Sequence, residues 1–238
     1  MTLISCPNKL SKSTLMHHFW TKPVLVWLGI LFFNSCQPKS PKLIDFGVSE
    51  GVMNKMDFSN LGLQKGQKME QGNLQTLQGK SFQVKEGKNK RPMLLISGSY
   101  TCDITRGNLL AIDSLFEKYK KVADVFLVNT LEAHPLSSQS PYSAEPIPWL
   151  AQDNLKAGIS AEQPRTMEER HLLAEKWIDE QKIKTPVLLD GAKNEFWNQA
   201  GQAPNMSILF SEDGVVIFKQ PWFEGKELET AIVEVLGL

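Results

Sequence analysis

The chain has 238 residues, of which 42% are hydrophobic, with 26 basic and 26 acidic side chains. This composition suits one globular domain with a sizeable core. The balanced charge gives no reason to expect nucleic acid as a partner. The three cysteines, at positions 6, 36 and 102, are too scattered for a disulfide framework or a paired zinc site, so we expect no metal.

The pattern of the N-terminal segment indicates a targeting sequence. An apolar run over residues 24–33 follows Lys22 and is too short for an ordinary transmembrane helix. The run ends before Cys36 in a pattern that resembles the lipobox of bacterial lipoproteins. We therefore interpret residues 1–35 as a signal peptide, with Met16 as an alternative start, and expect lipidation at Cys36. The alternative is a plain signal peptide or anchor.

If this interpretation is right, the protein is held on a membrane of the bacterial cell envelope by its N-terminal lipid. Residues 36–60 lack sustained periodicity and read as a tether. The remaining residues, 61–238, would form the folded domain and keep Cys102 as the one free thiol. That domain opens with residues 73–84, which alternate around Gly79 and predict a β-hairpin.

Alternating strand and helix patterns follow the hairpin. Short apolar runs predict strands, and apolar residues at helical spacing predict helices. We expect strands over 92–99, 124–130 and 186–190, helices over 108–119, 166–181 and 225–236, and two strands within 206–218 joined by a turn at Asp213-Gly214. Parallel βαβ units followed by a hairpin and a final helix predict an α/β, thioredoxin-like fold, with a central mixed sheet flanked by helices and extended by the N-terminal hairpin.

Cys102 stands where the strand over 92–99 gives way to a helix. A thiol at that place faces unpaired backbone N–H groups and the positive end of the helix dipole, both of which favour thiolate. Arg106, one turn further on, adds positive charge, while Asp103 opposes the effect. We therefore predict a partly exposed thiol with a lowered pKa. The alternative is a buried structural cysteine.

The segment "GSYTCDITRGNLLAIDSLFEKYKKVADVFLVNTLEAHP", residues 98–135, carries a more specific signal. It resembles the iodothyronine deiodinase family, which has a thioredoxin-like fold, selenocysteine at the position of Cys102, and a Glu-Ala-His segment after the next strand. Here that segment is residues 132–134. The likeness extends through "SPY" at 140–142 and "RTMEER" at 165–170, and covers roughly residues 90–236.

The resemblance implies a reductive dehalogenation that needs no bound cofactor and is completed by an external thiol. On this analogy Cys102 is the nucleophile, and Glu132 and His134 belong to a network that gives a proton to the substrate. Ser99 and Thr101 would form hydrogen bonds around the sulfur. The chemistry is coherent, because a soft thiolate can attack a polarisable halogen and the ring carbon that loses the halogen needs a proton.

The sequence departs from the family at several positions. Cysteine replaces selenocysteine, which predicts slower halogen chemistry. Asp103 and Ile104 stand where the family has prolines. A second family histidine falls at Gln163 or Pro164, which places recognition of thyroid hormone in doubt. His171 follows a few residues later, and its place in the helical pattern predicts a position on a helix face.

Pro204 comes just before the strand that begins near residue 206. Thioredoxin folds keep a cis-proline at such a place, packed against the catalytic thiol, where its backbone binds an extended substrate. We predict this arrangement for Pro204. The alternative is a trans-proline that opens the strand.

Three functions remain open from the sequence. The first is a deiodinase-like thiol oxidoreductase acting on a small halogenated substrate. The second is a one-cysteine peroxidase, in which a peroxide oxidises Cys102 to sulfenic acid. Both would need a thiol reductant or a thioredoxin-like reductase as partner. The third is a non-catalytic binding or metallochaperone module, although Cys102 and His134 alone would make a poor metal site.

Overall fold

The computed structural model describes residues 57–69, 72–84, 91–145 and 147–237. All of them belong to the compact unit Lys39–Leu238. The predicted signal peptide, Cys36 and most of the predicted tether lie outside the described residues.

The described residues form a seven-stranded mixed sheet in the order β2-β1-β5-β4-β3-β6-β7. Strands β3, β4 and β5 run parallel, and the other neighbouring pairs are antiparallel. The strands are β1 Leu74–Thr76, β2 Ser81–Phe82, β3 Met93–Gly98, β4 Asp124–Asn129, β5 Val187–Leu189, β6 Ser207–Phe210 and β7 Val216–Gln220. The predicted hairpin is β1–β2, and it extends the sheet at β5.

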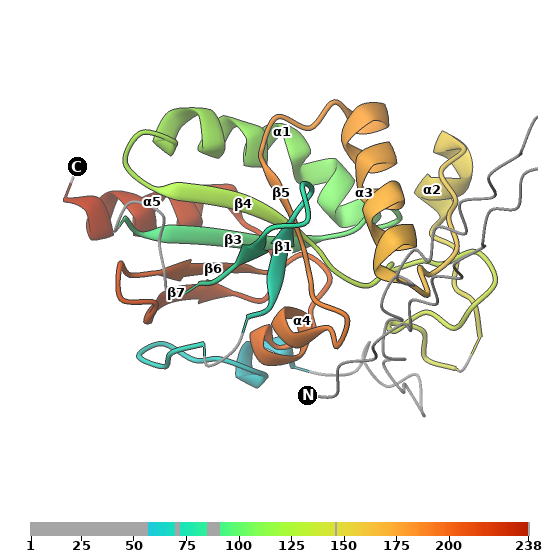
Figure 1. Cartoon of the computed structure of the whole chain (residues 1–238), viewed down its shortest axis with the longest axis horizontal. Helices are drawn as coiled ribbons and strands as arrows, with labels where there is room; N and C mark the ends of the chain where they lie inside the picture. The colour runs from blue at the N-terminus through green and yellow to red at the C-terminus, as the bar shows by residue number, and fades with distance from the viewer. Residues whose placement is uncertain (1–56, 70–71, 85–90, 146, 238) are drawn as a thin grey trace, which may run out of the picture. The chain divides into compact units, whose positions relative to one another are not determined.

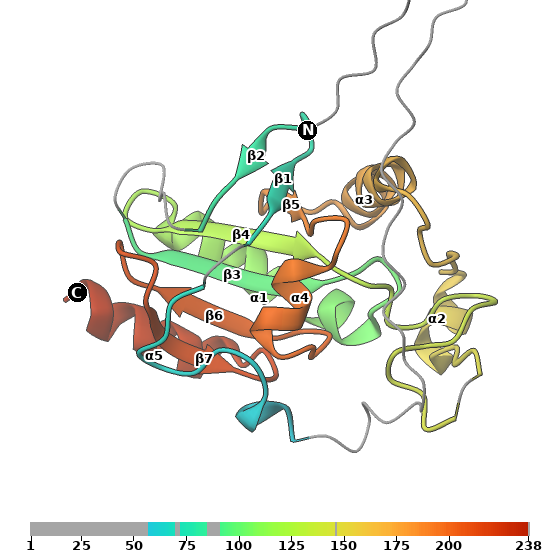
Figure 2. The same cartoon turned by 60° about the horizontal axis from the view of Figure 1, so that its bottom comes forward.

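Both faces of the sheet are covered, because its central strands are apolar on both sides. In β3, Leu94 and Ile96 face one hydrophobic cluster, while Met93 and Leu95 face another. The first cluster is completed by α1 (Asp103–Tyr119), α3 (Met167–Gln181) and α5 (Gly225–Leu236). Figure 2 shows α1 and α5 behind the sheet and α4 (Glu195–Ala200) in front of it.

The described chain begins with a short 3-10 helix, Phe58–Asn60. Phe58 is buried in the cluster on the α4 face and contacts the rings of Tyr142 and Trp222 edge-on. Its phenyl ring therefore belongs to the core, within a range that the sequence reads as tether. The following residues lie against the C-terminal end of α4, where Leu63 N–H donates to the carbonyl of Gln199.

Several loops of the chain lie together at one end of the sheet (Figure 1). The C-terminal ends of β3, β4 and β5 meet there because these strands are parallel. The start of α1 and the loops after β4 and β5 lie at this edge, which is where open α/β sheets place their ligands. A further short helix, α2 (Gln152–Ala157), follows in the long connection between β4 and α3.

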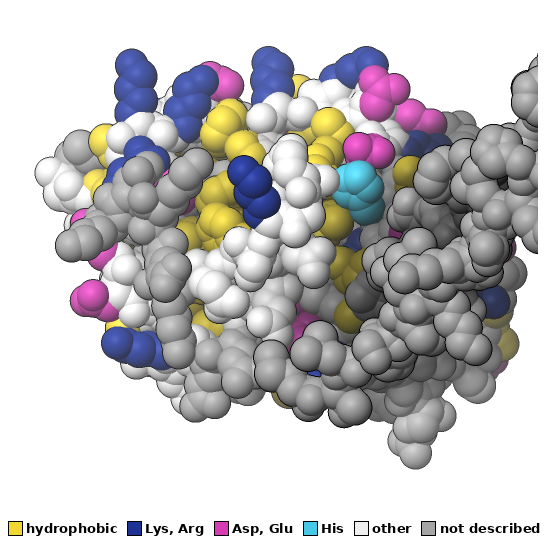
Figure 3. All heavy atoms as spheres, in the orientation of Figure 1, with side chains coloured by type: hydrophobic (Ala, Val, Ile, Leu, Met, Phe, Trp, Pro, Cys, Tyr) yellow, Lys and Arg dark blue, Asp and Glu magenta, His cyan; other side chains and the backbone are white. Residues whose placement is uncertain are grey.

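The outer surface over α1 carries charged side chains, and Ile104 and Leu110 are also exposed on this helix. Figure 3 shows lysine and arginine side chains there, with acidic side chains beside them. One ion pair on this surface joins Lys118 of α1 to Glu229 of α5. Within the part of the chain that the structure describes, no helix combines the length and the apolar character needed to cross a bilayer.

Candidate active site

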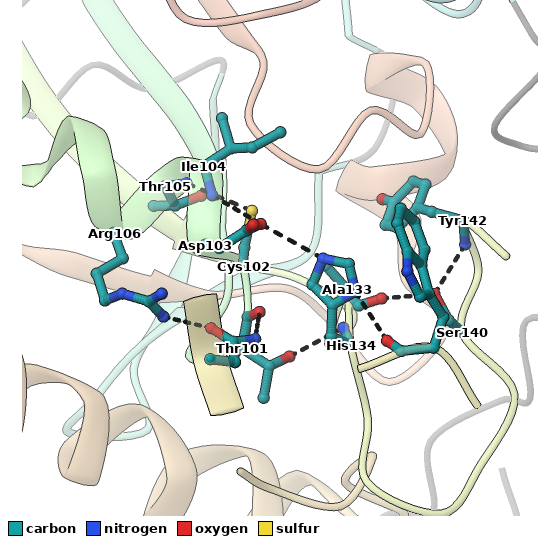
Figure 4. Close-up of polar contacts among 12 residues, drawn as sticks. Thr101, Cys102, Asp103, Ile104, Thr105, Arg106, Ala133, His134, Ser140 and Tyr142 are labelled. Atoms are coloured by element: carbon teal, nitrogen blue, oxygen red, sulfur yellow. Dashed lines mark hydrogen bonds and ion pairs between the residues drawn. The ribbon is translucent and has the colours of Figure 1, made fainter. Parts of the chain in front are cut away.

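Cys102 occupies the position that the sequence predicts, at the junction of β3 and α1. It is the N-cap of α1, and its sulfur accepts a hydrogen bond from the backbone N–H of Thr105 at 3.4 Å. Its own N–H donates to the carbonyl of Ser99 at 3.2 Å. Figure 4 shows the Thr105 amide directed at the sulfur. The thiol therefore replaces the hydroxyl or carboxylate that usually caps a helix.

The environment of this thiol is drier than the sequence predicts. Cys102 is 1% exposed and belongs to a hydrophobic cluster with Ala133, Tyr142 and Met206. Burial raises the pKa of Cys102 to about 11, although the hydrogen bond from Thr105 acts in the opposite direction. The prediction of an exposed thiol with a lowered pKa is therefore wrong for this conformation. Burial outweighs the helix terminus because a thiolate loses its hydration in an apolar cluster.

Glu132 connects the loop after β4 to the residue before the thiol. Its carboxylate Oε2 accepts both the backbone N–H of Thr101, at 2.7 Å, and the Thr101 hydroxyl, at 2.6 Å. Glu132 and Thr101 are both fully buried. Burial raises the pKa of Glu132, while the bonds from Thr101 act against the rise. The pair holds the backbone that leads into Cys102.

His134 joins the same network through its backbone. Its N–H donates to the Thr101 hydroxyl oxygen at 3.1 Å, so one threonine side chain contacts both Glu132 and His134. The sequence-predicted residues Thr101, Cys102, Glu132 and His134 thus lie within one connected group.

The His134 ring has different partners from its backbone. Nδ1 lies 2.9 Å from the carbonyl oxygen of Trp149, and Nε2 lies 3.4 Å from Oδ1 of Asp103. The Trp149 ring meets the imidazole edge-on, with centroids 4.6 Å apart. A carbonyl oxygen can only accept, so Nδ1 carries a hydrogen and Nε2 is the nitrogen that faces Asp103.

Ser99 supports the loop that carries His134. Its hydroxyl accepts the N–H of Ala133 at 3.2 Å, and the Ala133 carbonyl accepts the Ser140 hydroxyl at 2.6 Å. Ser140 also accepts the N–H of Tyr142 at 3.1 Å. Ser99 therefore holds the loop and does not bond to the sulfur through any contact of the described residues.

Arg106 points away from the thiol (Figure 4). Its guanidinium donates to the side-chain oxygen of Asn154 in α2, and Asn154 in turn donates to the carbonyl of Thr101 at 2.6 Å. Arg106 thus braces the peptide before Cys102 and does not place its charge at the sulfur.

Pro204 lies in a loop at the end of β3, but the cis-proline prediction is wrong. The described residues contain no cis peptide bond. The loop is fixed by Ser97, whose hydroxyl donates to the carbonyl of Ala203 at 3.1 Å and accepts the N–H of Met206 at 2.8 Å. Asn205 adds a bond to the Ser97 carbonyl at 3.0 Å. These bonds satisfy the polar groups of the loop with a trans-proline.

Gln163 stands near the position at which the resemblance implies a histidine. Its side-chain oxygen accepts the backbone N–H of Glu132 at 3.0 Å, so it supports the same loop. His171 lies on α3, where Nε2 is 3.5 Å from Oε1 of Glu175 one turn away. It is a helix-face residue, as the helical pattern predicts.

Sequence reasoning misses a second buried polar group beside the site. Arg170 of α3 is fully buried and donates to the carbonyls of Asp190 and Gly191 and to the side chain of Asn194. Burial lowers the pKa of Arg170, while the charges of Asp190 and Glu132 act against that change. Arg170 thus lies close enough to Glu132 for the two charges to interact. The helical pattern of residues 166–181 gives no sign that this arginine points inward.

The geometry defines a thioredoxin-like domain with one thiol at the start of its first helix. Solved structures agree on this fold. A thiol:disulfide interchange protein from Bacteroides sp. aligns with a TM-score of 0.50 at 14% identity, over 74% of this chain and 92% of that one.

Two further structures align less closely. A protein from Chlorobium tepidum, described as the thiol:disulfide interchange protein DsbE, aligns with a TM-score of 0.49 at 18% identity, over 74% of this chain and 99% of that one. The thioredoxin domain of a Bacteroides vulgatus thiol-disulfide oxidoreductase aligns with a TM-score of 0.47 at 14% identity, over 73% of this chain and 99% of that one. No protein-family model matches the chain, and no curated protein matches it significantly. These likenesses concern the fold, and function must be argued from the site.

Proposed function

We propose that the chain is a thiol oxidoreductase in which Cys102 attacks its substrate and an external thiol restores it. The observation that carries this proposal is the connection of Cys102 to the Glu132–His134 loop through Thr101. The Cys102 thiol and the His134 imidazole lie at the same end of the sheet, which supports the proposal. A histidine beside a thiol suits general acid catalysis near neutral pH.

The more specific proposal is reductive dehalogenation of an iodinated aromatic compound, which the resemblance to deiodinases supports. The Cys102 thiolate would form an S–I bond while the C–I bond breaks, with its electron pair left on carbon. His134 would give that carbon a proton. One external thiol would then displace iodide from sulfur, and a second would release Cys102 and leave as a disulfide.

The burial of Cys102 favours a second candidate, a non-catalytic binding module of the same fold. A thiol that is 1% exposed and has a pKa raised to about 11 resembles a core residue in its environment. The raised pKa counts against both reactions in this conformation, because dehalogenation and peroxide reduction each begin with the Cys102 thiolate. The Thr101 hydroxyl and Arg106 are also committed to Glu132 and Asn154, which leaves His134 as the acid for either reaction.

The deciding experiment follows turnover with dithiothreitol and a panel of iodinated phenols and peroxides, measuring iodide release and peroxide loss. We expect iodide release that disappears in Cys102→Ser and falls about 10²- to 10⁴-fold in His134→Ala, as for lost general acid catalysis. His171→Ala, a histidine on the outer face of α3, is the matched control and should retain full turnover. Iodide release that persists in Cys102→Ser would exclude the mechanism, and no turnover of any substrate would favour the binding module.

We also propose that the protein is attached to a membrane of the cell envelope by lipid on Cys36. The support is the leader pattern of residues 1–36. The natural protein should partition into the detergent phase of Triton X-114, and Cys36→Ser should move it to the aqueous phase. An intact mass that retains residues 31–34 on the mature protein would contradict this anchor.

A further inference from the structure

Asp103 is the first residue of α1 and follows the thiol directly. Its Oδ1 accepts the backbone N–H of Ile104 at 3.0 Å and lies 3.4 Å from Nε2 of His134. These contacts fix the carboxylate beside the thiol and aim it at the imidazole (Figure 4). The Asp103 side chain is 29% exposed, so a molecule approaching from solvent can reach it while Cys102 is still covered.

The other charged groups near the thiol are engaged elsewhere. Glu132 is fully buried and bonds to both donors of Thr101. The Arg106 guanidinium is bound to Asn154 of α2. Within the described residues, the ionisable side chain that faces the Asp103 carboxylate is His134. Asp103 therefore dominates the local field at the entrance to Cys102 whenever His134 is neutral.

We propose that Asp103 is a specificity-determining residue, whose carboxylate disfavours anionic electrophiles at Cys102 and selects uncharged or cationic ones. This inference rests on the proposed function, in which Cys102 is the nucleophile. The Trp149 carbonyl, which accepts from Nδ1 of His134, leaves Nε2 as the imidazole nitrogen that faces this carboxylate. For two unit charges on the order of 5 Å apart in a largely solvated environment, Coulomb's law gives a change of about 4- to 15-fold in the preference between reagents.

The inference is testable with two alkylating reagents that differ in charge. Iodoacetamide is neutral and iodoacetate is anionic. In both reactions the thiolate forms an S–C bond and iodide leaves with the electron pair of the C–I bond. The rate constants would be measured at pH 8 on the full chain. Mass spectrometry of the peptide that contains Cys102 separates it from the other two cysteines.

We expect Asp103→Asn to lower the ratio of the iodoacetamide rate to the iodoacetate rate by about 4- to 15-fold, and Asp103→Ser to do the same. Asp103→Glu retains the charge and should keep the wild-type ratio. Glu117→Gln, which removes one negative charge near the other end of α1, is the matched control and should also keep it. High salt should reduce the effect of Asp103→Asn, because screening weakens exposed charges.

An unchanged ratio in both Asp103→Asn and Asp103→Ser would overturn the inference. An equal rise of both rates would also overturn it, because more thiolate or a more open site would explain it without any selection by charge. The test needs no natural substrate. If wild-type protein lacks turnover but the ratio changes as expected, the proposed function fails while the charge selection at Cys102 stands.

Discussion

Burial raises the pKa of Cys102, while the N-terminus of α1 lowers it. The pH dependence of Cys102 alkylation measures directly which of these two effects is larger. A thiol with a pKa of about 11 is ionised in about one molecule in a thousand at pH 8, whereas a free cysteine with a pKa of about 8.5 is ionised in about one in four. Only the thiolate reacts with iodoacetamide. We therefore expect Cys102 in the folded protein to react at least about 200-fold more slowly at pH 8 than an unhindered thiol.

The assay follows the modified Cys102 peptide by mass spectrometry from pH 7 to 11, on folded protein and on protein unfolded in guanidinium chloride. In folded protein the rate should rise about tenfold per pH unit and continue to rise to about pH 11. In unfolded protein it should level off near pH 9. Cys102→Ser provides the background.

The reasoning would be refuted by a folded-state rate that levels off below pH 9, or by one that equals the unfolded-state rate at pH 8. Stability gives a second measurement. Because folding raises this pKa, the stability linked to the neutral thiol is fully present below the unfolded value and is lost as pH rises through about 11. The free energy of unfolding should fall by about 3 kcal/mol over that interval, and Cys102→Ser should lack this component.

Three further predictions concern the buried polar groups. Glu132→Ala leaves the N–H and hydroxyl of Thr101 without their acceptor. It should lower the free energy of unfolding by about 2–4 kcal/mol in urea titrations. A loss under about 1 kcal/mol would contradict a stabilising role for these two hydrogen bonds. Arg170→Met removes three hydrogen bonds and a buried charge and should cost about 3–5 kcal/mol. Burial raises the pKa of Asp190 to about 6, so its contribution to stability is present below about pH 4 and lost as pH rises through 6, by about 3 kcal/mol. Asp190→Asn should remove this loss from denaturation curves recorded between pH 4 and 7.

The sheet and the long helices are predictable because their signals are local. The run around β3 is apolar on both faces, which marks a central strand. At the start of α3 the Thr166 hydroxyl accepts the N–H of Glu169 at 3.1 Å, which is the capping bond that a Ser/Thr-x-x-Glu sequence favours at a helix N-terminus. Gly214 adopts a positive φ of 73° in the turn between β6 and β7, which is the conformation that Asp-Gly indicates. In each case a few neighbouring residues determine the structure.

The partners of the site are not predictable in this way. Asp103 contacts His134 although the two residues are 31 positions apart in the sequence. Trp149 contacts the same histidine from a loop without regular structure. The sequence pairs His134 with Glu132, but within the described residues the Glu132 carboxylate reaches only the backbone N–H of His134, through the Thr101 hydroxyl, and the imidazole has other partners. The burial of Cys102 depends on Tyr142 and Met206, which come from separate loops. Short helices such as α2 and α4 also escape prediction, because six residues carry too little periodicity.

The raised pKa of Cys102 and its proposed chemistry can be reconciled by considering which influence changes when a substrate arrives. Burial is the largest cause of the rise, and the Thr105 N–H already favours the thiolate. A ligand that displaces apolar side chains and admits water would remove the effect of burial and leave the hydrogen bond from the Thr105 N–H. The thiol would then ionise only after the site has opened. Exposure of Cys102, and not a permanently ionised thiol, would thus control its reactivity, and Asp103 would select among molecules before that exposure occurs.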